Sequence, residues 1–600
     1  MAPARRDPPP AILIRDVEPQ VDCGRYPVKR VVGEDVVVTA TIFRDGHDVL
    51  GAAIRYRPPG IRRWREAPLE PLGNDRWRGS FTVDAPGRWT FSVIAWTDRI
   101  ASWQREVTRK LEGGQTDLAG ELSEGRALLG EDVSLEEALA IQSDDRHGEV
   151  ELNVKLGVEV DVELARFGAW YELFPRSWGG FAGVEKVLPQ LADVGFDVVY
   201  LPPIHPIGHT NRKGRNNAVT AKRGDVGSPW AIGTEEGGHT AIHPDLGTLA
   251  GFERLVARAR ETGIEIALDY AIQCSPDHPW LQEHPEWFHR RPDGTLKYAE
   301  NPPKKYQDIY NVNFASEDWR GLWEALRDVM LHWVSHGVRV FRVDNPHTKP
   351  VAFWEWLIAE VRRVEPKLVL LSEAFTRPAM MTTLAKVGFA QSYTYFTWKN
   401  TKAELEELMA QILDWREFYR PNFFANTPDI LHEYLQLGGQ PAFEARLVLA
   451  ATLSPSYGIY SGFERFENVP VQQGSEEYLD SEKYEVRKRK LDGPLLPLVQ
   501  RLNGIRRAER ALQRVDNLRW LETEHDPLVA YIKDDVVVVV NIDPFEAHEG
   551  LAIVPAALGL PPTFFARDLL GGERYRWTIG RNFVRLDPGQ SHIFKLETHV

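Results

Sequence analysis

Cysteine is scarce in this sequence, and long apolar runs and an excess of positive charge are missing; each of these features excludes a class of protein. Cys23 and Cys274 are the two cysteines among 600 residues, too few for a disulfide scaffold and without the spacing of a metal site. No stretch approaches the ~20 apolar residues of a membrane-spanning helix. Residues 1–10 are rich in proline and contain no apolar segment that could act as a signal peptide. We therefore expect a reduced, soluble, cytoplasmic protein.

The charge balance argues against further classes of binding partner, and the length indicates more than one domain. With 72 basic and 86 acidic residues the formal net charge is −14, which argues against broad binding of nucleic acids or of anionic membranes. Because a single hydrophobic core seldom exceeds roughly 250–300 residues, a chain of 600 residues is expected to form several domains.

Short β-rich runs separated by turn signals begin the sequence. Residues 36–43 end at Asp45-Gly46, and residues 77–83 and 89–96 flank a segment that contains Pro86-Gly87. This pattern predicts an N-terminal β-sandwich over residues 1–110. Residues 111–160 are charged and favour helix, so we expect a small helical insertion there.

From Gly168 onward, apolar strands alternate with amphipathic helices. The candidate strands are residues 169–173, 198–201, 264–268, 338–343, 368–371, 392–396, 422–425 and 458–460. Eight such β/α units predict an α/β fold, a (β/α)8 TIM barrel over residues 161–520, with an excursion subdomain near 208–247. Residues 521–600 return to β-strands, with a hairpin at Asp534-Asp535, and predict a C-terminal β-sandwich.

Three acids stand at the ends of predicted barrel strands. Asp344 ends the fourth strand, Glu373 the fifth and Asp429 the seventh. Retaining glycosidic chemistry needs one carboxylate to attack the anomeric carbon and another to handle the proton, so Asp344 is the predicted nucleophile and Glu373 the general acid/base. Asp429 is expected to bind sugar hydroxyls. Arg342 lies two residues before Asp344 on the same strand face and should keep Asp344 ionised.

The order of these acids on strands four, five and seven resembles the α-amylase family of retaining glycoside hydrolases and transglycosylases. The segments 246–256, 264–269 and 458–464 are also similar to that family. Two departures stand out. Gln273-Cys274 replaces the Asn-His pair that usually follows the third strand, and Pro428 replaces a histidine before Asp429. The usual calcium ligand is therefore missing, and we expect no metal and no cofactor.

Four further segments resemble one subgroup, the maltosyltransferases that use α-maltose 1-phosphate to extend α-1,4-glucans. They are residues 204–217, 273–280, 300–308 and 344–350. The resemblance implies a phosphate site and a donor-sugar site. The implied phosphate ligands are Lys213, Asn301, Lys304 and Tyr306, and the implied contacts to donor sugar or phosphate are Gln273, Asn345, Lys483 and Tyr484. Ammonium, amide and phenol donors can satisfy a phosphate dianion.

The expected activity is transfer of maltosyl units from α-maltose 1-phosphate to the non-reducing end of α-1,4-glucans, with release of phosphate. The resemblance also implies a homodimer, with the helical insertion as a contact surface. The alternatives are an amylase-type hydrolase or a trehalose-forming isomerase of the same clan. A non-catalytic glucan-binding protein is a third alternative, although all three acids and Arg342 are present.

Overall fold

The computed structural model describes residues 11–130, 134–143, 145–301 and 304–597. The side chains of Asn301 and Lys304 lie outside the described part, so their predicted contacts to phosphate stay predictions. The chain forms two compact units, Met1–Asp161 and Val162–Val600.

The first unit contains two β-sheets. The first sheet has the order β1 (Ile12–Glu18), β3 (Asp35–Arg44), β7 (Arg76–Thr82) and β6 (Glu70–Gly73). The second has the order β2 (Val28–Val31), β10 (Leu156–Asp161), β8 (Gly87–Asp98), β4 (Val49–Arg57) and β5 (Arg65–Pro68), and β9 (His147–Glu151) pairs with β8. Tyr56 of the second sheet stacks on Phe81 of the first, with ring centroids 4.4 Å apart. The two sheets therefore face one another as the predicted sandwich.

The helical segment of this unit differs from its predicted bounds. Helices α1 (Arg99–Glu112), α2 (Ala119–Leu129) and α3 (Leu135–Ala140) pack around a small cluster that includes Trp103, Val107 and Ala138. Helix α1 therefore begins before residue 111, and residues 147–161 contribute β9 and β10 to the sheet. Sequence propensity alone does not reveal this pairing, because β10 finds its partners β2 and β8 far away along the chain.

The second unit is built on a closed barrel of eight parallel strands. They are β11 (Gly168–Glu172), β12 (Val198–Leu201), β13 (Glu265–Tyr270), β16 (Val340–Val343), β17 (Val369–Ser372), β18 (Gln391–Tyr393), β19 (Pro421–Phe424) and β20 (Ser456–Tyr460). Nearly every residue of these strands is buried, as is usual for a parallel sheet covered on its faces. The predicted TIM barrel is confirmed. The sixth strand is shorter than predicted because Tyr395–Trp398 forms a 3-10 turn.

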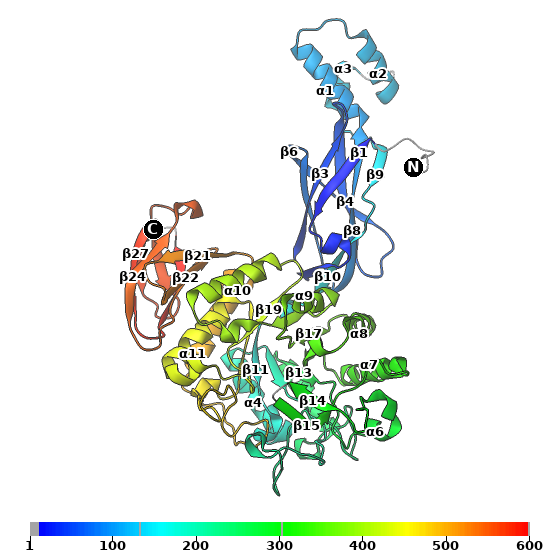
Figure 1. The fold of residues 1–600 in the computed structure, drawn as a ribbon. Coiled ribbons are helices and arrows are strands. Elements are labelled where there is room, and N and C mark those ends of the chain that lie inside the picture. Colours follow the sequence, from blue (N-terminus) through cyan, green and yellow to red (C-terminus); the bar gives the residue numbers. More distant parts are fainter. Residues whose placement is uncertain (1–10, 131–133, 144, 302–303, 598–600) are drawn as a thin grey trace. The chain divides into compact units, whose positions relative to one another are not determined.

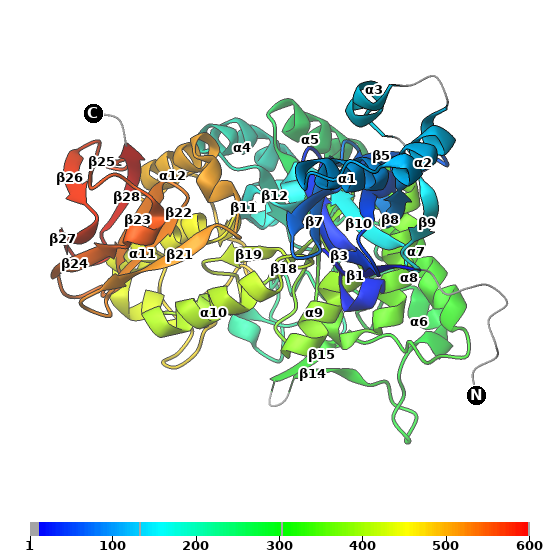
Figure 2. The same ribbon diagram turned by 90° about the horizontal axis from the view of Figure 1, so that it is seen from above.

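Helices surround the barrel strands in the view of Figure 2. They are α4 (Gly180–Val194), α5 (Leu249–Glu261), α7 (Trp319–Ser335), α8 (Val351–Val364), α9 (Pro378–Val387), α10 (Lys402–Asp414), α11 (Glu433–Leu453) and α12 (Leu496–Ala508). Residues 208–247 between β12 and α5 form the predicted long excursion, which holds two 3-10 turns, Arg215–Asn217 and Pro244–Leu246. After β13 come a short helix, α6 (Trp280–Glu283), and an antiparallel hairpin, β14 (Tyr298–Asn301) with β15 (Lys304–Tyr310), which we did not predict.

The C-terminal strands lie beside α11 in Figure 1 and form one folded sheet. They are β21 (Leu518–Thr523), β22 (Leu528–Lys533), β23 (Val536–Asn541), β24 (His548–Val554), β25 (Thr563–Asp568), β26 (Arg574–Thr578), β27 (Gly580–Leu586) and β28 (Ser591–Glu597). Buried side chains from both ends of this sheet share one core, including Val584 of β27 and Trp577 of β26. The sheet thus closes over itself as a sandwich, and β22 and β23 form the predicted hairpin at Asp534-Asp535.

Candidate active site

Three barrel strands deliver charged side chains to the same end of the barrel. Asp269 lies in β13, Asp344 follows β16 and Glu373 follows β17. The backbone N–H of Asp344 donates to the carbonyl of Tyr270 at 3.1 Å, and that of Glu373 donates to Val343 at 3.1 Å. Because the strand ladder continues through both residues, their positions are set by the barrel. The C-terminal end of the strands is where TIM barrels carry their chemistry.

Arg342 joins the three carboxylates. Its side chain is only 6% exposed, and Nη1 lies 2.9 Å from Asp269 Oδ2 and 2.9 Å from Asp344 Oδ1. Nη2 lies 2.5 Å from Glu373 Oε1. Tyr200 donates its hydroxyl to the Asp269 carboxylate as well. One guanidinium therefore contacts both predicted catalytic acids and fixes the distance between them. Asp269 holds the same guanidinium in place.

The two predicted catalytic acids have pKa values shifted in opposite directions. Burial opposes ionisation of Asp344, but the positive charges of Arg342 and Lys349 outweigh it and hold its pKa below the ordinary value. Burial raises the pKa of Glu373 to about 8, against the attraction of Arg342 and with added repulsion from Asp344. An ionised carboxylate beside a protonated one is the arrangement that a nucleophile and a general acid require.

The turn after Asp344 is held by several hydrogen bonds. Asn345 adopts a left-handed backbone conformation, with φ 42° and ψ 52°, which asparagine tolerates better than most residues. Its backbone N–H donates to Glu373 Oε2 at 3.2 Å, and its Nδ2 lies 3.4 Å from Asp344 Oδ2. The Lys349 ammonium donates to the carbonyls of Asp344 and Asn345 at 3.4 and 3.2 Å. Asn345 therefore touches both acids.

Gln273 also reaches the predicted nucleophile. Its Nε2 donates to Asp344 Oδ2 at 2.5 Å. A neutral amide thus contacts Asp344 from the segment after β13, where the α-amylase family usually has an Asn-His pair. The buried Oε1 of Gln273 has no partner within the described part of the chain, so it is available to a sugar hydroxyl.

These residues open into a cavity of about 560 Å³. Nine of the twelve predicted site residues line it, namely Asp344, Glu373, Asp429, Lys213, Gln273, Tyr306, Asn345, Lys483 and Tyr484. Arg342 is not among the lining residues, but it contacts Asp344 and Glu373. The roles of all twelve residues stay predictions, but the structure brings nine of them to one space.

Two lysines approach the cavity from loops. Lys213 comes from the excursion after β12, is almost fully buried, and donates to Gln307 Oε1 at 2.7 Å. Lys483 comes from the long segment between β20 and α12 and pairs with the Asp429 carboxylate. Its ammonium also lies over the Trp230 ring, 5.3 Å from the centroid. The side chain of Asp429 is 41% exposed, so this acid is far more open to solvent than Asp344.

Sequence reasoning missed other residues that line the cavity. They include Ser228, Trp230, Asp308, Lys349, Phe375, Trp398 and Glu476. Trp398 donates to Glu476 Oε1 at 2.7 Å, and Phe375 meets Trp398 edge to face at 5.0 Å. Lys349 and Phe375 could have been found from their positions just after the strand-end acids. Trp230 and Glu476 carry no such signal, because only the folding of long loops brings them here.

One buried group of side chains has the composition of a metal site. His239, Cys274 and His278 offer ligand atoms within 4.8 Å of one another. However, His239 Nδ1 and His278 Nε2 hydrogen-bond each other at 3.0 Å, and burial raises the pKa of the Cys274 thiol far above its usual range. A metal ion would have to replace that hydrogen bond, so we assign none there. Within the described residues, the helices are all too short or too polar to cross a membrane.

Three protein families match the chain. Residues 10–166 match domain N/S of alpha-1,4-glucan:maltose-1-phosphate maltosyltransferase, residues 170–324 match the alpha amylase catalytic domain, and residues 520–596 match the GLGE C-terminal family. Among solved structures, a cyclomaltodextrinase superposes with a TM-score of 0.58 at 13% identity, covering 96% of this chain and 99% of its own. An alpha-amylase from Lactobacillus plantarum gives 0.57 at 22% identity, covering 72% and 99%. These structures show the fold.

Curated relatives are much more similar in sequence. Alpha-1,4-glucan:maltose-1-phosphate maltosyltransferase 2 of Streptomyces coelicolor is 49% identical, over 97% of this chain and 96% of the relative. The enzyme of the same name from Mycolicibacterium smegmatis is 48% identical, over 98% and 97%. The resemblance inferred from the motifs is thereby confirmed, and the chain belongs to the alpha-1,4-glucan:maltose-1-phosphate maltosyltransferases, a family of the alpha-amylase type.

Proposed function

We propose that the protein transfers maltosyl units from α-maltose 1-phosphate to the non-reducing end of α-1,4-glucans, with release of phosphate and retention of the α configuration. Its relatives carry the name of this activity. The observation that carries the proposal is that a retaining acid pair, Asp344 and Glu373, lines the same cavity as Lys213 and Tyr306. A starch hydrolase has no need of a buried ammonium and a phenol beside its acids.

In the first half-reaction Asp344 attacks the anomeric carbon, and the bond from that carbon to the phosphate oxygen breaks. Arg342, 2.9 Å from Asp344 Oδ1, keeps the nucleophile ionised. Glu373 is protonated at neutral pH because its pKa is about 8, so it can donate a proton to the departing phosphate. Since phosphate already leaves readily, this acid help is smaller here than in starch cleavage. The result is a maltosyl ester of Asp344.

In the second half-reaction Glu373, now ionised, accepts the proton of a 4-hydroxyl at the end of a glucan. The oxygen attacks the anomeric carbon and the ester to Asp344 breaks, so the acceptor grows by one maltosyl unit. Asp429, held by Lys483, is suited to grip hydroxyls of the distorted sugar ring. The backbone N–H of Asn345 keeps Glu373 oriented at 3.2 Å through both steps.

The donor phosphate is expected to lie among Lys213, Tyr306 and Asn345, together with Asn301 and Lys304 as the family resemblance implies. Gln273 and the pair Lys483-Tyr484 are expected to hold the maltosyl unit. Lys213 is the best supported of these, because its buried ammonium donates to two uncharged oxygens, Gln307 Oε1 at 2.7 Å and the Lys305 carbonyl at 3.3 Å, and the nearby charge of Asp308 favours its charged form. A charge-assisted hydrogen bond of this kind is about twice as strong as a neutral one.

The test is phosphate release from α-maltose 1-phosphate, with and without maltohexaose, followed by mass spectrometry of the products. Release that needs the acceptor, with products longer by two glucose units, is the expected result. Cleavage of starch or rearrangement of maltose, without phosphate release, would contradict the proposal and leave the hydrolase or isomerase alternative.

Three further proposals concern the whole protein. We infer four domains: an N-terminal sandwich that includes β9 and β10, an inserted helical part formed by α1–α3, the barrel over residues 161–520 and a C-terminal sandwich over residues 521–600. We also infer a homodimer that uses helices α1–α3, and a cytoplasmic location. Leu111 and Ile141 on or next to these helices are 42% and 36% exposed, which gives the contact some apolar surface. Light scattering of the purified protein tests the dimer, and a monomer at micromolar concentration would contradict it.

A further inference from the structure

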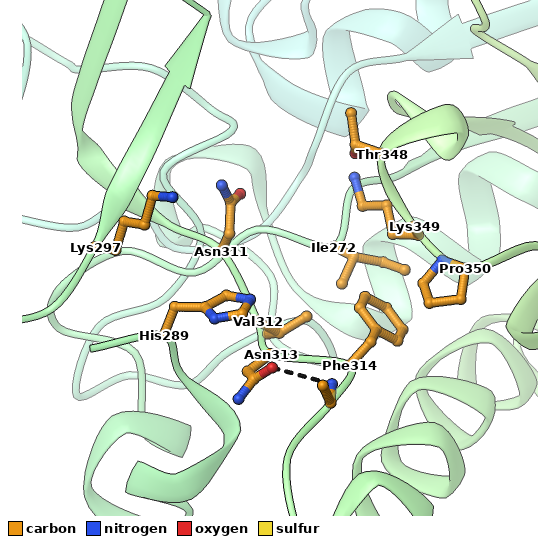
Figure 3. A pocket seen from close by; sticks show the side chains of 11 residues that line it. Ile272, His289, Lys297, Asn311, Val312, Asn313, Phe314, Thr348, Lys349 and Pro350 are labelled. Carbon is orange, nitrogen blue, oxygen red and sulfur yellow. Dashed lines mark hydrogen bonds between the residues drawn. The ribbon is translucent and has the colours of Figure 1, made fainter. Parts of the chain in front are cut away.

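A second pocket adjoins the catalytic cavity. Its volume is about 470 Å³, and none of the eleven described residues that line it is Asp or Glu (Figure 3). The lining residues are Ile272, His289, Lys297, Asn311, Val312, Asn313, Phe314, Ala315, Thr348, Lys349 and Pro350. The catalytic cavity is lined by six acids. In a protein with a net charge of −14, this pocket therefore presents the positive charge of Lys297, while that of Lys349 is shared with Asp344 and Glu373.

The cations reach this pocket from opposite sides. Figure 3 shows Lys297 and His289 on one side, from the segment that precedes β14, and Lys349 on the other, from the loop after β16. Lys297 and His289 are exposed. Their side chains form no hydrogen bond or ion pair to protein groups in the described ranges of the chain. The charge of Lys297 is therefore free to act on a ligand.

The ring of His289 adds a polar group without adding charge. Partial burial and the nearby ammonium of Lys297 both keep its pKa below the ordinary value, so the imidazole is neutral at neutral pH. The amide of Asn311 points upward between Lys297 and Lys349 in Figure 3. Amide, imidazole and hydroxyl donors next to two ammonium groups suit the oxygens of a phosphate group.

The two spaces share a wall. Asn311, Thr348 and Lys349 line both the second pocket and the catalytic cavity. Lys349 also donates to the carbonyls of Asp344 and Asn345 at 3.4 and 3.2 Å. A group bound in the second pocket is therefore one side chain away from the predicted nucleophile. A pocket this close to the catalytic cavity can hold a substrate before the reaction or a product after it.

We propose that the second pocket is a phosphate-binding vestibule, which holds the phosphate group of the arriving donor, the released inorganic phosphate, or each in turn. The inference rests on the proposed function, because that reaction brings in one phosphate ester and releases one phosphate in each cycle. A glucan is the less suitable ligand. Sugar sites typically offer aromatic faces and carboxylates, and here Phe314 is the one aromatic ring other than His289 among the lining residues.

The test compares Lys297→Ala with Lys186→Ala, which removes the same charge from the exposed face of α4 and lines neither space. Initial rates are measured with α-maltose 1-phosphate and maltohexaose, with inorganic phosphate as product inhibitor. In Lys297→Ala we expect the inhibition constant of phosphate or the KM of the donor to rise about threefold, the effect of one partly exposed charge. The acceptor KM should not change, and Lys186→Ala should behave like the wild type.

The pattern of change identifies the source of the phosphate. A rise in the inhibition constant alone assigns the pocket to released phosphate, and a rise in the donor KM alone assigns it to the donor. Unchanged values for both, or a higher KM for maltohexaose only, overturn the proposal.

Calorimetry with inorganic phosphate separates this inference from the proposed function, because it needs no turnover. If the wild type releases no phosphate from the donor, the proposed function fails, yet weaker binding of inorganic phosphate by Lys297→Ala would still support the pocket. Equal binding of inorganic phosphate and equal binding of α-maltose 1-phosphate by wild type and variant would overturn it.

Discussion

The floor and the rim of the catalytic cavity are built in different ways. The floor, Arg342 with Asp269, Asp344 and Glu373, stands on adjacent barrel strands, and its ion pairs are nearly closed to solvent. The rim stands outside the barrel strands, on the hairpin β14–β15 for Tyr306 and on loops for Lys213, Asp429 and Lys483, and Asp429 is 41% exposed. From this comparison we propose that the strand ladder of the barrel positions the residues for bond breaking, whereas the segments outside the barrel strands determine which donor is used. Substitutions in the two regions should therefore have different consequences.

Removing the predicted nucleophile should have the largest effect. Asp344→Asn keeps the shape of the side chain but cannot form the maltosyl ester, so we expect transfer to fall by ~10⁴-fold or more, as in other enzymes that lose a nucleophile. Phosphate release measured over hours checks this. Asp429→Asn, a rim variant, should retain more activity, and equal losses would contradict the distinction between floor and rim.

Glu373→Ala should be slower by about 10²- to 10⁴-fold, the usual contribution of a general acid/base. The loss should fall mainly on the second half-reaction, because phosphate needs little acid help to leave. Intact-mass spectrometry after mixing with donor should show the protein with one maltosyl unit attached. Asp344→Asn should show no adduct. If Glu373→Ala shows none either, Glu373 is not the base of the second half-reaction.

Arg342→Gln should destabilise the floor itself. It leaves three carboxylates without their shared cation, and breaking a buried ion pair costs about 3–5 kcal/mol. The midpoint of thermal unfolding should fall clearly. Arg254→Gln is the matched control, since its partner Glu185 lies in an exposed pair worth under about 1 kcal/mol. Equal midpoints for the two variants would show that the ion pairs of Arg342 stabilise the fold no more than an exposed ion pair does.

Lys213→Ala should change donor use without disturbing the floor. Loss of one charged hydrogen bond, about 1.5–3 kcal/mol, predicts a KM for α-maltose 1-phosphate higher by about tenfold or more, with an unchanged acceptor KM. Lys222→Ala, in the same excursion and exposed, is the control. A raised acceptor KM with an unchanged donor KM would place Lys213 at the acceptor side.

The smallest expected effect is a pH dependence. Glu373 acts as an acid only when protonated, and its pKa is about 8, so kcat/KM for the donor should decline as the pH rises above about 8. Because phosphate needs little acid help to leave, the decline should be shallow and should level off once Glu373 is ionised. The residual activity of Glu373→Gln should lack this alkaline limb. A limb that persists in that variant would belong to another group, such as Lys349, whose pKa burial lowers.

Much of the fold followed from local patterns. Apolar runs separated by amphipathic helices gave the eight barrel strands to within a few residues, because a parallel strand buried on both faces must be apolar throughout. The hairpin β14–β15 was missed, since its polar residues have no alternating pattern. Strands β9 and β10 were missed because their partners lie about 50 or more residues away along the chain.

The sequence by itself determined the barrel, the order of the acids Asp344, Glu373 and Asp429, and the family, because strand-end motifs are contiguous in the chain. Only the tertiary structure decided the sharing of Arg342 among three carboxylates, the pairing of Lys483 with Asp429, and the acid-free pocket around Lys297 and Lys349. These features join residues from separate loops and strands. Their distances, and the pKa shifts that depend on burial and on neighbouring charges, exist only once the chain has folded.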